Sequence, residues 1–207
     1  MERGNFFVLE GGEGSGKTSI LNKLKKIYPN DLFVNDPNSE IESCKIIRDL
    51  LLNKKYNLEK NNELLLYTVS RSELVHKKII PALNSGQNVW CDRFILSTLV
   101  YQGGIRKIDL SKIFSLHSYH CNNLMPDISY LCDVDAKIGL SRSRKRLEDN
   151  NIEESRWEEE GLKIHKKVNN LYLDFINFDN KHKILNSNKM SIVEMVNQII
   201  LHKTMEN

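Results

Sequence analysis

Near the N-terminus the sequence reads Gly11-Gly12-Glu13-Gly14-Ser15-Gly16-Lys17-Thr18, which is a complete G-x-x-x-x-G-K-[ST] loop. The loop follows an apolar run at residues 6–9, which predicts a buried strand. After the loop, apolar residues at positions 20, 21, 24 and 27 recur at helical spacing. Strand, loop and helix in this order are the context in which the pattern binds phosphate, whereas the alternative is a chance glycine-rich turn. The stretch therefore predicts that the chain binds a nucleoside triphosphate.

The residues of the loop have separate chemical tasks. The glycines let successive backbone N–H groups point inward and surround phosphate oxygens, and the dipole of the following helix favours the same negative charge. Lys17 can reach the outer phosphates, and the Thr18 hydroxyl can ligate Mg²⁺. The motif thus predicts magnesium together with the triphosphate.

The composition is that of an ordinary globular chain. At 207 residues it has the length of one domain, or of one domain with a small lid, and 40% apolar residues can bury a sizeable core. The formal net charge of +3 is too small to argue for nucleic acid or for a membrane surface. No apolar stretch approaches the roughly 20 residues of a membrane span, and the first strand begins where a signal peptide would lie. We therefore expect a cytoplasmic protein without a nucleic-acid or membrane partner.

Two histidines invite a metal-site interpretation. His117 and His120 would share a helix face, and Cys121 is next to them. A second pair of ligands, which a structural metal needs, does not stand nearby in the sequence. We expect ordinary helix residues here, with a structural metal as the alternative.

Apolar runs and helical periods alternate along the chain. The runs predict five strands, at about residues 5–10, 31–35, 87–91, 128–134 and 182–186. Helical periodicity lies near residues 16–28, 41–53, 58–84, 95–120, 136–148, 156–178 and 190–203. Strands separated by helices imply βαβ units. The expected fold class is α/β, with a five-stranded parallel sheet and helices on both of its faces.

One segment departs from this pattern. Residues 141–163 carry first a basic block and then an acidic block, in which Arg156 is embedded. Such a segment has little apolar surface to bury, so it should be mobile until a ligand neutralises it. In a phosphate-binding protein it predicts a lid, and its basic residues would meet a small anionic substrate. The alternative for any one of these basic residues is a solvated helix face.

The third predicted strand ends in an acid followed by a base, Asp92 and Arg93. In open α/β sheets ligands bind at the carboxyl ends of the strands, where both side chains would project. Asp92 can hold Mg²⁺ beside Thr18, and the planar guanidinium of Arg93 suits a second phosphate group. A surface salt bridge is the alternative, but the position beside the bound phosphates favours a functional pair.

At this point the chain resembles the thymidylate kinase family, in the bacterial type whose lid carries the catalytic arginine. Residues 92–104 read DRFILSTLVYQGG, close to the family's pattern of acid, arginine and aromatic, then serine, then tyrosine and glutamine. Residues 63–71 match the helix of the family that ends in an arginine, and residues 80–86 follow at the right interval. Pro-Asp at 126–127 and Arg-Trp-Glu at 156–158 also fit, so the resemblance spans nearly the whole chain.

The resemblance implies both a fold and an activity. The fold would be the three-layer P-loop nucleoside-monophosphate-kinase type, as a single domain over residues 1–207 with the lid at about 141–163. The activity would be Mg²⁺-dependent transfer of the γ-phosphoryl group of ATP to dTMP, which gives dTDP and ADP. A homodimer packed through helices next to the acceptor site is also implied.

Carried over by position, the resemblance implies roles at the base and sugar of the acceptor. Arg71 would hydrogen-bond the thymine edge, and Tyr67, where phenylalanine is usual in the family, would stack on the ring. Tyr101 would lie against the 2′ carbon of the sugar and exclude a ribose hydroxyl. Thr98 and Gln102 would contact the base or its surroundings.

Other roles concern the phosphates. Glu13 would accept a hydrogen bond from the 3′-hydroxyl of the sugar, and Lys17 would contact the donor phosphates. Arg93 would bind the acceptor phosphate. Arg156 would move in with the lid against the transferring phosphoryl group.

One stretch departs from the family pattern. The family carries Arg-Glu-Pro-Gly after its second strand, and this chain reads Asn35-Asp36-Pro37-Asn38. The carboxylate is kept at Asp36, one methylene shorter, and is expected at the acceptor site. The lost guanidinium could contribute roughly 1.5–3 kcal/mol. Either Arg93 and a neighbour compensate, or the acceptor binds more weakly or is a different nucleotide.

Other interpretations remain open. Tyr67 and Tyr101 are residue types that also occur in cores, and Arg71 could belong to a surface ion-pair network. For the whole chain, the alternatives are another nucleoside-monophosphate or deoxynucleoside kinase, or a non-catalytic P-loop nucleotide-binding module. The second would be marked by loss of Arg93, Arg156 or the base-site residues, and none of these is lost.

Overall fold

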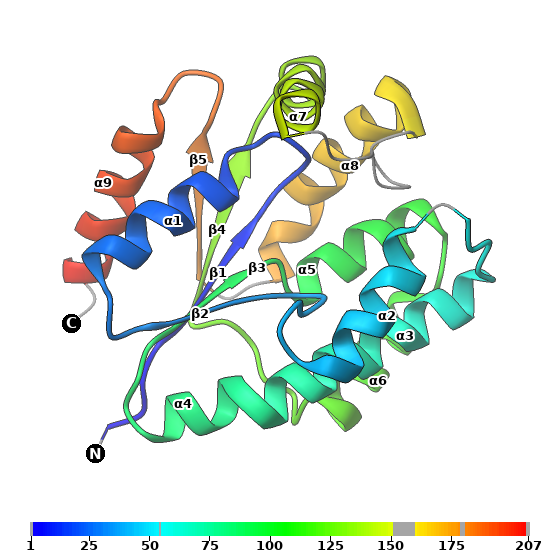
Figure 1. Cartoon of the computed structure of the whole chain (residues 1–207), viewed down its shortest axis with the longest axis horizontal. Coiled ribbons are helices and arrows are strands. Elements are labelled where there is room, and N and C mark those ends of the chain that lie inside the picture. Colours follow the sequence, from blue (N-terminus) through cyan, green and yellow to red (C-terminus); the bar gives the residue numbers. More distant parts are fainter. Residues whose placement is uncertain (1, 54, 151–159, 179–180, 206–207) are drawn as a thin grey trace.

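The computed structural model describes residues 2–53, 55–150, 160–178 and 181–205, and its centre is a five-stranded sheet (Figure 1). The strands lie in the order β2-β3-β1-β4-β5, and all neighbouring pairs are parallel. They are β1 (Phe6–Glu10), β2 (Leu32–Asn35), β3 (Val89–Asp92), β4 (Ile128–Asp133) and β5 (His182–Asn186). Each strand overlaps the apolar run that predicted it, so the predicted α/β fold with a five-stranded parallel sheet is confirmed.

Helices cover both faces of the sheet (Figure 1). One face carries α1 (Lys17–Ile27) and α9 (Ile192–Met205). The other helical segments are α2 (Glu42–Leu52), α3 (Lys60–Leu74), the π-helical η1 (Val75–Ile79), α4 (Ile80–Asn84), α5 (Ile95–Thr98), the π-helical η2 (Leu99–Ile105), α6 (Leu110–His120), α7 (Ala136–Asn150), α8 (Gly161–Phe175) and the 3₁₀ turn η4 (Ile176–Phe178). Among the described residues, no helix is both long and apolar enough to cross a membrane.

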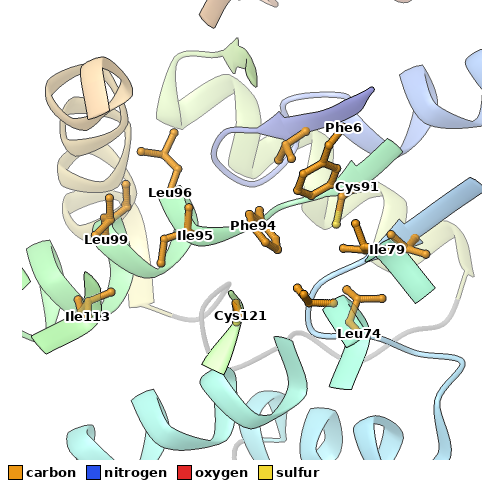
Figure 2. Close-up of a cluster of buried hydrophobic side chains, with 14 of the residues drawn as sticks. Phe6, Leu74, Ile79, Cys91, Phe94, Ile95, Leu96, Leu99, Ile113 and Cys121 are labelled. Carbon is orange, nitrogen blue, oxygen red and sulfur yellow. The ribbon is translucent and has the colours of Figure 1, made fainter. Parts of the chain in front are cut away.

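The alternation of side chains along β1 creates two cores. Phe6 and Val8 pack into a cluster with residues of α3, α5, α6 and α8, whereas Phe7 and Leu9 pack against α1 and α9. Figure 2 shows the first cluster, in which the rings of Phe6 and Phe94 meet edge to face with centroids 5.0 Å apart. Burying one side chain of this size contributes roughly 1.5–3 kcal/mol. Phe94 thereby anchors the segment that follows β3.

The strand register brings three loops to one edge of the sheet. Leu9 of β1 and Asn35 of β2 both align with Asp92 of β3. Because the strands are parallel, their carboxyl ends meet, and so do the segments that follow them. The phosphate loop, Asp36 and Arg93 therefore lie near one another although they are far apart in the sequence.

One predicted helix differs from what the structure contains, and the predicted lid is described only in part. The prediction of one helix over 95–120 is wrong, because α5 and η2 end at Ile105 and α6 begins at Leu110. Lys107 has a positive φ of 60°, and Asp109 caps α6 by accepting from the backbone N–H of Ser111. In the predicted lid, residues 141–150 belong to α7, and 151–159 lie outside the described residues. A single domain with a lid stays a prediction.

Candidate active site

The phosphate loop connects β1 to α1 and surrounds the ammonium group of Lys17. Lys17 Nζ donates to the carbonyl oxygens of Gly11 and Gly12, both at 3.0 Å, and to Ser15 Oγ at 3.2 Å. Burial lowers the pKa of Lys17, and the nearby Arg93 lowers it further, while Asp92 opposes the shift. A phosphate oxygen carries formal charge and is a stronger acceptor than these carbonyls. The ammonium group is therefore ready to exchange them for a phosphate.

Gly14 and Gly16 of the loop have left-handed backbones and lie against neighbouring helices. Gly14 has a φ of +65°, and a Cβ atom there would lie 1.9 Å from the carbonyl oxygen of Gly139 in α7. Gly16, which precedes α1, has a φ of +93°, and its Cβ would lie 2.8 Å from Cδ1 of Ile192. The left-handed backbone favours glycine at both positions, and at Gly14 the close approach of the Gly139 backbone requires it as well. The loop is thus packed between the starts of α7 and α9.

Thr18 and Asp92 meet, as the sequence predicted. The Thr18 hydroxyl donates to Asp92 Oδ2 at 3.2 Å, which joins the first turn of α1 to the end of β3. The other carboxylate oxygen, Asp92 Oδ1, is buried without a hydrogen-bond partner in the described part of the chain. A buried, unsatisfied carboxylate oxygen is costly unless a cation or water meets it, and Mg²⁺ prefers oxygen ligands. The pair therefore fits a magnesium ion.

Arg93 lies between the phosphate loop and α8. Its backbone is left-handed, with φ 71°. Nη1 donates to the Gly11 carbonyl at 2.7 Å and to the Tyr172 hydroxyl at 2.6 Å, and Nη2 pairs with Glu13 Oε1 at 2.8 Å. Burial raises the pKa of Glu13, but the positive charges of Arg93 and Lys17 outweigh burial and lower it overall. Glu13 therefore stays ionised beside the loop.

A buried carboxylate supports the backbone around Arg93. Glu10, at the end of β1, is fully buried, and its Oε1 accepts from the backbone N–H of Phe94 at 2.7 Å. Its Oε2 accepts from Ser97 Oγ at 2.6 Å, and the Ser97 hydroxyl lies 2.8 Å from that of Tyr172. A network in which each member has a partner is rigid. Glu10 thus fixes the turn that presents Arg93.

Arg71 forms the floor of a second subsite. Its side chain is almost fully buried, with Nε donating to Asp36 Oδ2 at 2.6 Å and Nη2 to Thr98 Oγ1 at 2.6 Å. Burial raises the pKa of Asp36, and Arg71 counteracts part of that shift. Asp36 and Thr98 therefore hold the guanidinium in one orientation. The alternative of a surface ion-pair network does not apply to a side chain 3% exposed.

Tyr101 and Gln102 follow Thr98 in the π-helical segment η2 and line the same cleft. The Tyr101 ring packs edge to face on Tyr172 with centroids 6.4 Å apart, and the guanidinium carbon of Arg93 lies 5.7 Å from its centroid. Burial raises the pKa of Tyr101 far above its usual range, so its hydroxyl stays protonated. Tyr67, on α3, is half-buried and also lines the cleft. Both tyrosines thus form part of the cleft wall, in addition to any packing role in the core.

The departure at Asn35 has a structural counterpart. The Asn35 side chain donates to the Pro37 carbonyl at 2.7 Å and accepts from Ser39 Oγ at 2.9 Å, so it closes its own turn. Arg48 of α2 donates to the same Pro37 carbonyl at 2.7 Å and lines the cleft. Its pKa is lowered, chiefly by burial. A guanidinium from α2 therefore lies beside the position where the resemblance leads one to expect an arginine.

Most of these groups, though not Glu10 and Tyr172, border one continuous cleft of about 1520 Å³. A pocket for one small ligand holds roughly 300–1,000 Å³, so this cleft has room for two. Besides the phosphate loop, the cleft is lined by the predicted acceptor-site residues Asp36, Tyr67, Arg71, Thr98, Tyr101 and Gln102, and also by Arg142, Ser187 and Ile192.

One predicted catalytic residue, Arg156, lies outside the described residues. The sequence analysis also missed groups that the structure brings to the site, namely Glu10, Arg48, Tyr172 and Glu63, which accepts a hydrogen bond from Gln102. Glu10 and Glu63 had a detectable signal, since each is an acid within an apolar context. His117, considered as a metal ligand, is buried in α6 with Nε2 2.7 Å from the Leu124 carbonyl oxygen. No group of three or more potential ligand side chains occurs within the described ranges.

Known proteins match this chain over almost its whole length. The sequence model of the family described as Thymidylate kinase matches residues 9–199. A thymidylate kinase of Clostridium novyi (strain NT) is 34% identical over 195 residues, covering 91% of this chain and 93% of that protein. One of Pelobacter propionicus is 34% identical over 209 residues, covering 99% and 95%, and one of Staphylococcus epidermidis is 35% identical over 186 residues, covering 88% of each. The chain therefore belongs to the thymidylate kinase family.

Proposed function

We propose that this protein transfers the γ-phosphoryl group of ATP to the 5′-phosphate of dTMP. One observation carries the proposal beyond family membership. The phosphate loop and the Arg71 subsite open into one cleft, and Arg93 lies next to both the loop and Tyr101. Donor and acceptor would then meet at Arg93, with their reacting phosphates held in line.

Phosphoryl transfer asks little covalent chemistry of the protein. Rate comes from aligning donor and acceptor and from neutralising charge on the moving group. Lys17 neutralises the donor phosphates, and Arg93 exchanges Glu13 and the Gly11 carbonyl for the acceptor phosphate. Arg156 supplies a further positive charge from the lid. No general base is needed, because the acceptor phosphate oxygen is already ionised at neutral pH.

Thr18 and Asp92 are the residues that would hold Mg²⁺. The ion, when bound, supplies positive charge to the phosphate oxygens of ATP. The buried oxygen Asp92 Oδ1, which lacks a partner in the described part of the chain, supports this assignment.

The acceptor's base and sugar would meet side chains from several segments of the chain. Arg71 faces the base edge, with Asp36 acting through it, while Tyr67 provides a ring for stacking. Thr98 orients Arg71, and Gln102 contacts the edge of the base. Tyr101 limits the space beside the 2′ carbon of the sugar. Glu13 accepts from the 3′-hydroxyl. Arg48 provides a guanidinium in place of the arginine that the family carries at the position of Asn35.

We also infer a homodimer in the cytoplasm. Leu65 and Val69, one helical turn apart on α3, are 48% and 49% exposed, which supports contact with a second copy next to the acceptor subsite. Sedimentation of the protein at several concentrations checks the dimer, and a monomer at all of them contradicts it.

The function is tested by ADP release in the presence of ATP and Mg²⁺ with dTMP, dUMP, dCMP, dGMP, UMP and thymidine as acceptors. A strong preference for dTMP is expected, and it would show that Asn35 is tolerated. Turnover with a different acceptor would keep the phosphate chemistry and reject the assigned base site. Tight ATP binding without any turnover would favour a nucleotide-binding module instead.

A further inference from the structure

A second buried carboxylate lies behind the base subsite. Glu63, in the first turn of α3, is fully buried, and its Oε1 accepts from Gln102 Nε2 at 2.8 Å. Arg106 Nη2 lies 3.6 Å from the other oxygen, Glu63 Oε2. Glutamate side chains are ordinarily carboxylates at neutral pH. Glu63 is therefore an acceptor without a proton to donate.

This contact fixes which way the Gln102 amide points. A carboxylate only accepts hydrogen bonds, so the amide must turn its NH₂ group toward Glu63. The inverted amide would place two oxygens against each other in a buried site. Gln102 also lines the cleft, and no donor from the described part of the chain meets its carbonyl oxygen. The amide thus has a carbonyl oxygen left for a ligand.

Arg71 provides the complementary group. Nε and Nη2 of Arg71 are occupied by Asp36 and by Thr98 and the Phe94 carbonyl, and Nη1 has no partner among the described residues. Thr98, which accepts from Arg71, is four residues before Gln102 and thus about one turn away. A guanidinium donates only. The lining of the cleft therefore includes a fixed donor, Arg71, and a fixed acceptor, Gln102, and Thr98 lies one helical turn from Gln102 and bonds Arg71.

This order of donor and acceptor matches one class of pyrimidine. Thymine and uracil present an acceptor at O4 and a donor at N3–H, whereas cytosine presents a donor at N4 and an acceptor at N3. Against cytosine, both protein groups would face a group of their own kind. A site whose buried polar groups would be left unpaired rejects the wrong ligand strongly.

We propose that Glu63 is a positioning residue that locks the Gln102 amide with its oxygen toward the base and so selects a keto pyrimidine over cytosine. The proposal rests on the proposed function and adds a determinant of its specificity. Glu63 is not among the residues that line the cleft, so it would act on the base through Gln102. A residue that only stabilises α3 would affect all acceptors equally, whereas Glu63 should affect their ratio.

The decisive variant is Glu63→Gln, in which residue 63 can donate as well as accept, so the Gln102 amide can invert. Calorimetric binding of dTMP and of dCMP to the full chain, without ATP, gives the ratio of the two dissociation constants. We expect Glu63→Gln to reduce that ratio at least tenfold. Glu63→Asp keeps an acceptor-only group and should retain most of the ratio even if both affinities fall. Glu73→Gln, on the same helix, is the matched control and should leave the ratio unchanged.

A cycle with Gln102 separates positioning from stability. In a Gln102→Leu background, Glu63→Gln should have no further effect on the ratio, because the amide through which Glu63 acts is gone. An equal loss of affinity for both nucleotides in Glu63→Gln, or a further change of ratio in the Gln102→Leu background, would overturn the proposal.

A measurement on the unmodified protein covers the case in which Glu63→Gln does not fold. NMR of the Gln102 side-chain amide, assigned by its absence in Gln102→Leu, should show an NH₂ group protected from solvent exchange with and without dTMP. An NH₂ group that exchanges freely, or that becomes protected only when dTMP binds, would contradict the lock. If the wild-type protein does not favour dTMP over dCMP, both the proposed function and this inference fail. If it does and the variant keeps the ratio, only the inference fails.

Discussion

The phosphate loop and the base subsite are built in opposite ways. The loop is eight consecutive residues, and its binding groups are mostly backbone N–H groups held in place by glycines. The proposed base subsite collects Asp36, Glu63, Arg71, Thr98 and Gln102 from three stretches of the chain, and each of these side chains is buried. A backbone site depends on local conformation, whereas a side-chain site depends on every segment that supplies a partner. The phosphate loop can therefore be recognised in the sequence as a motif, whereas the base subsite forms only when the chain packs.

The comparison predicts that damage to the loop affects chemistry for every acceptor. Lys17→Ala should lower kcat roughly 10²–10³-fold with dTMP and with any weaker acceptor alike, because a charge that meets the transferring group is lost. Steady-state kinetics at saturating substrates measures this. Lys23→Ala, on the exposed face of α1, is the control. A kcat within threefold of the wild type would remove Lys17 from the mechanism.

A substitution in the base subsite should instead change the KM for dTMP without changing the KM for ATP. Arg71→Lys keeps the charge but loses the planar fork that joins Asp36, Thr98 and the base. We expect the KM for dTMP to rise about 10- to 100-fold, with the KM for ATP within twofold of the wild type. Lys77→Arg is the control. It replaces an exposed residue in η1, directly after α3, and should change neither KM value. Parallel rises in both constants would indicate general disruption of the cleft.

We expect acid to lower the stability of the fold through His117, which lies on the same side of the sheet as the base subsite. Its ring packs edge to face on Phe94 with centroids 5.5 Å apart, and burial, followed by the charge of Arg71, lowers its pKa from 6.5 to about 4. Between about pH 6.5 and pH 4, His117 is therefore protonated in the unfolded chain but neutral in the folded chain. The free energy of unfolding consequently falls as the pH drops through this range. This group alone removes about 2 kcal/mol by pH 5.

The check is the free energy of unfolding of the wild type and His117→Gln at pH 7 and pH 5. The variant should lose less stability between the two pH values than the wild type. His120→Gln, at the exposed end of the same helix, should behave as the wild type. An identical pH dependence for all three proteins would show that His117 does not contribute.

The smallest expected effect concerns the sugar. Replacing Tyr101 by alanine opens space between Arg93 and Tyr172, so a 2′-hydroxyl should be accommodated. We expect the ratio of kcat/KM for dUMP to that for UMP to fall about tenfold, which is about 1.4 kcal/mol. Tyr101→Phe keeps the ring and serves as the control. An unchanged ratio in Tyr101→Ala would leave Tyr101 with a core role only.

Local pattern was sufficient where one segment contains its own determinants. Strand runs, the loop and its helix are set by side-chain period and by glycine, so the parallel sheet and the phosphate site were predicted. Asp92 beside Thr18 also followed, because parallel strands bring their carboxyl ends together. The single helix over 95–120 failed because a positive φ at Lys107 and the cap at Asp109 give no strong apolar signal.

The base subsite was reachable from the sequence only by resemblance. Residue types such as Tyr67 and Arg71 on a helix have several ordinary roles, and spacing alone does not choose among them. Glu10, Arg48 and Glu63 were missed because their partners are 84, 11 and 39 residues away in the chain. Contacts at such separations exist only after the sheet and its helices have packed.

The sequence by itself determined the fold class, the phosphate loop and the family. These rest on the period of apolar residues, the freedom of glycine and a lysine at a fixed place, which act within a few residues. Only the tertiary structure decided that Asp36 and Thr98 hold Arg71, that Asn35 closes its own turn while Arg48 lies beside it, and that Glu63 accepts a hydrogen bond from Gln102. A buried polar group must find its partner across the fold, and the direction of each hydrogen bond is set by that partner.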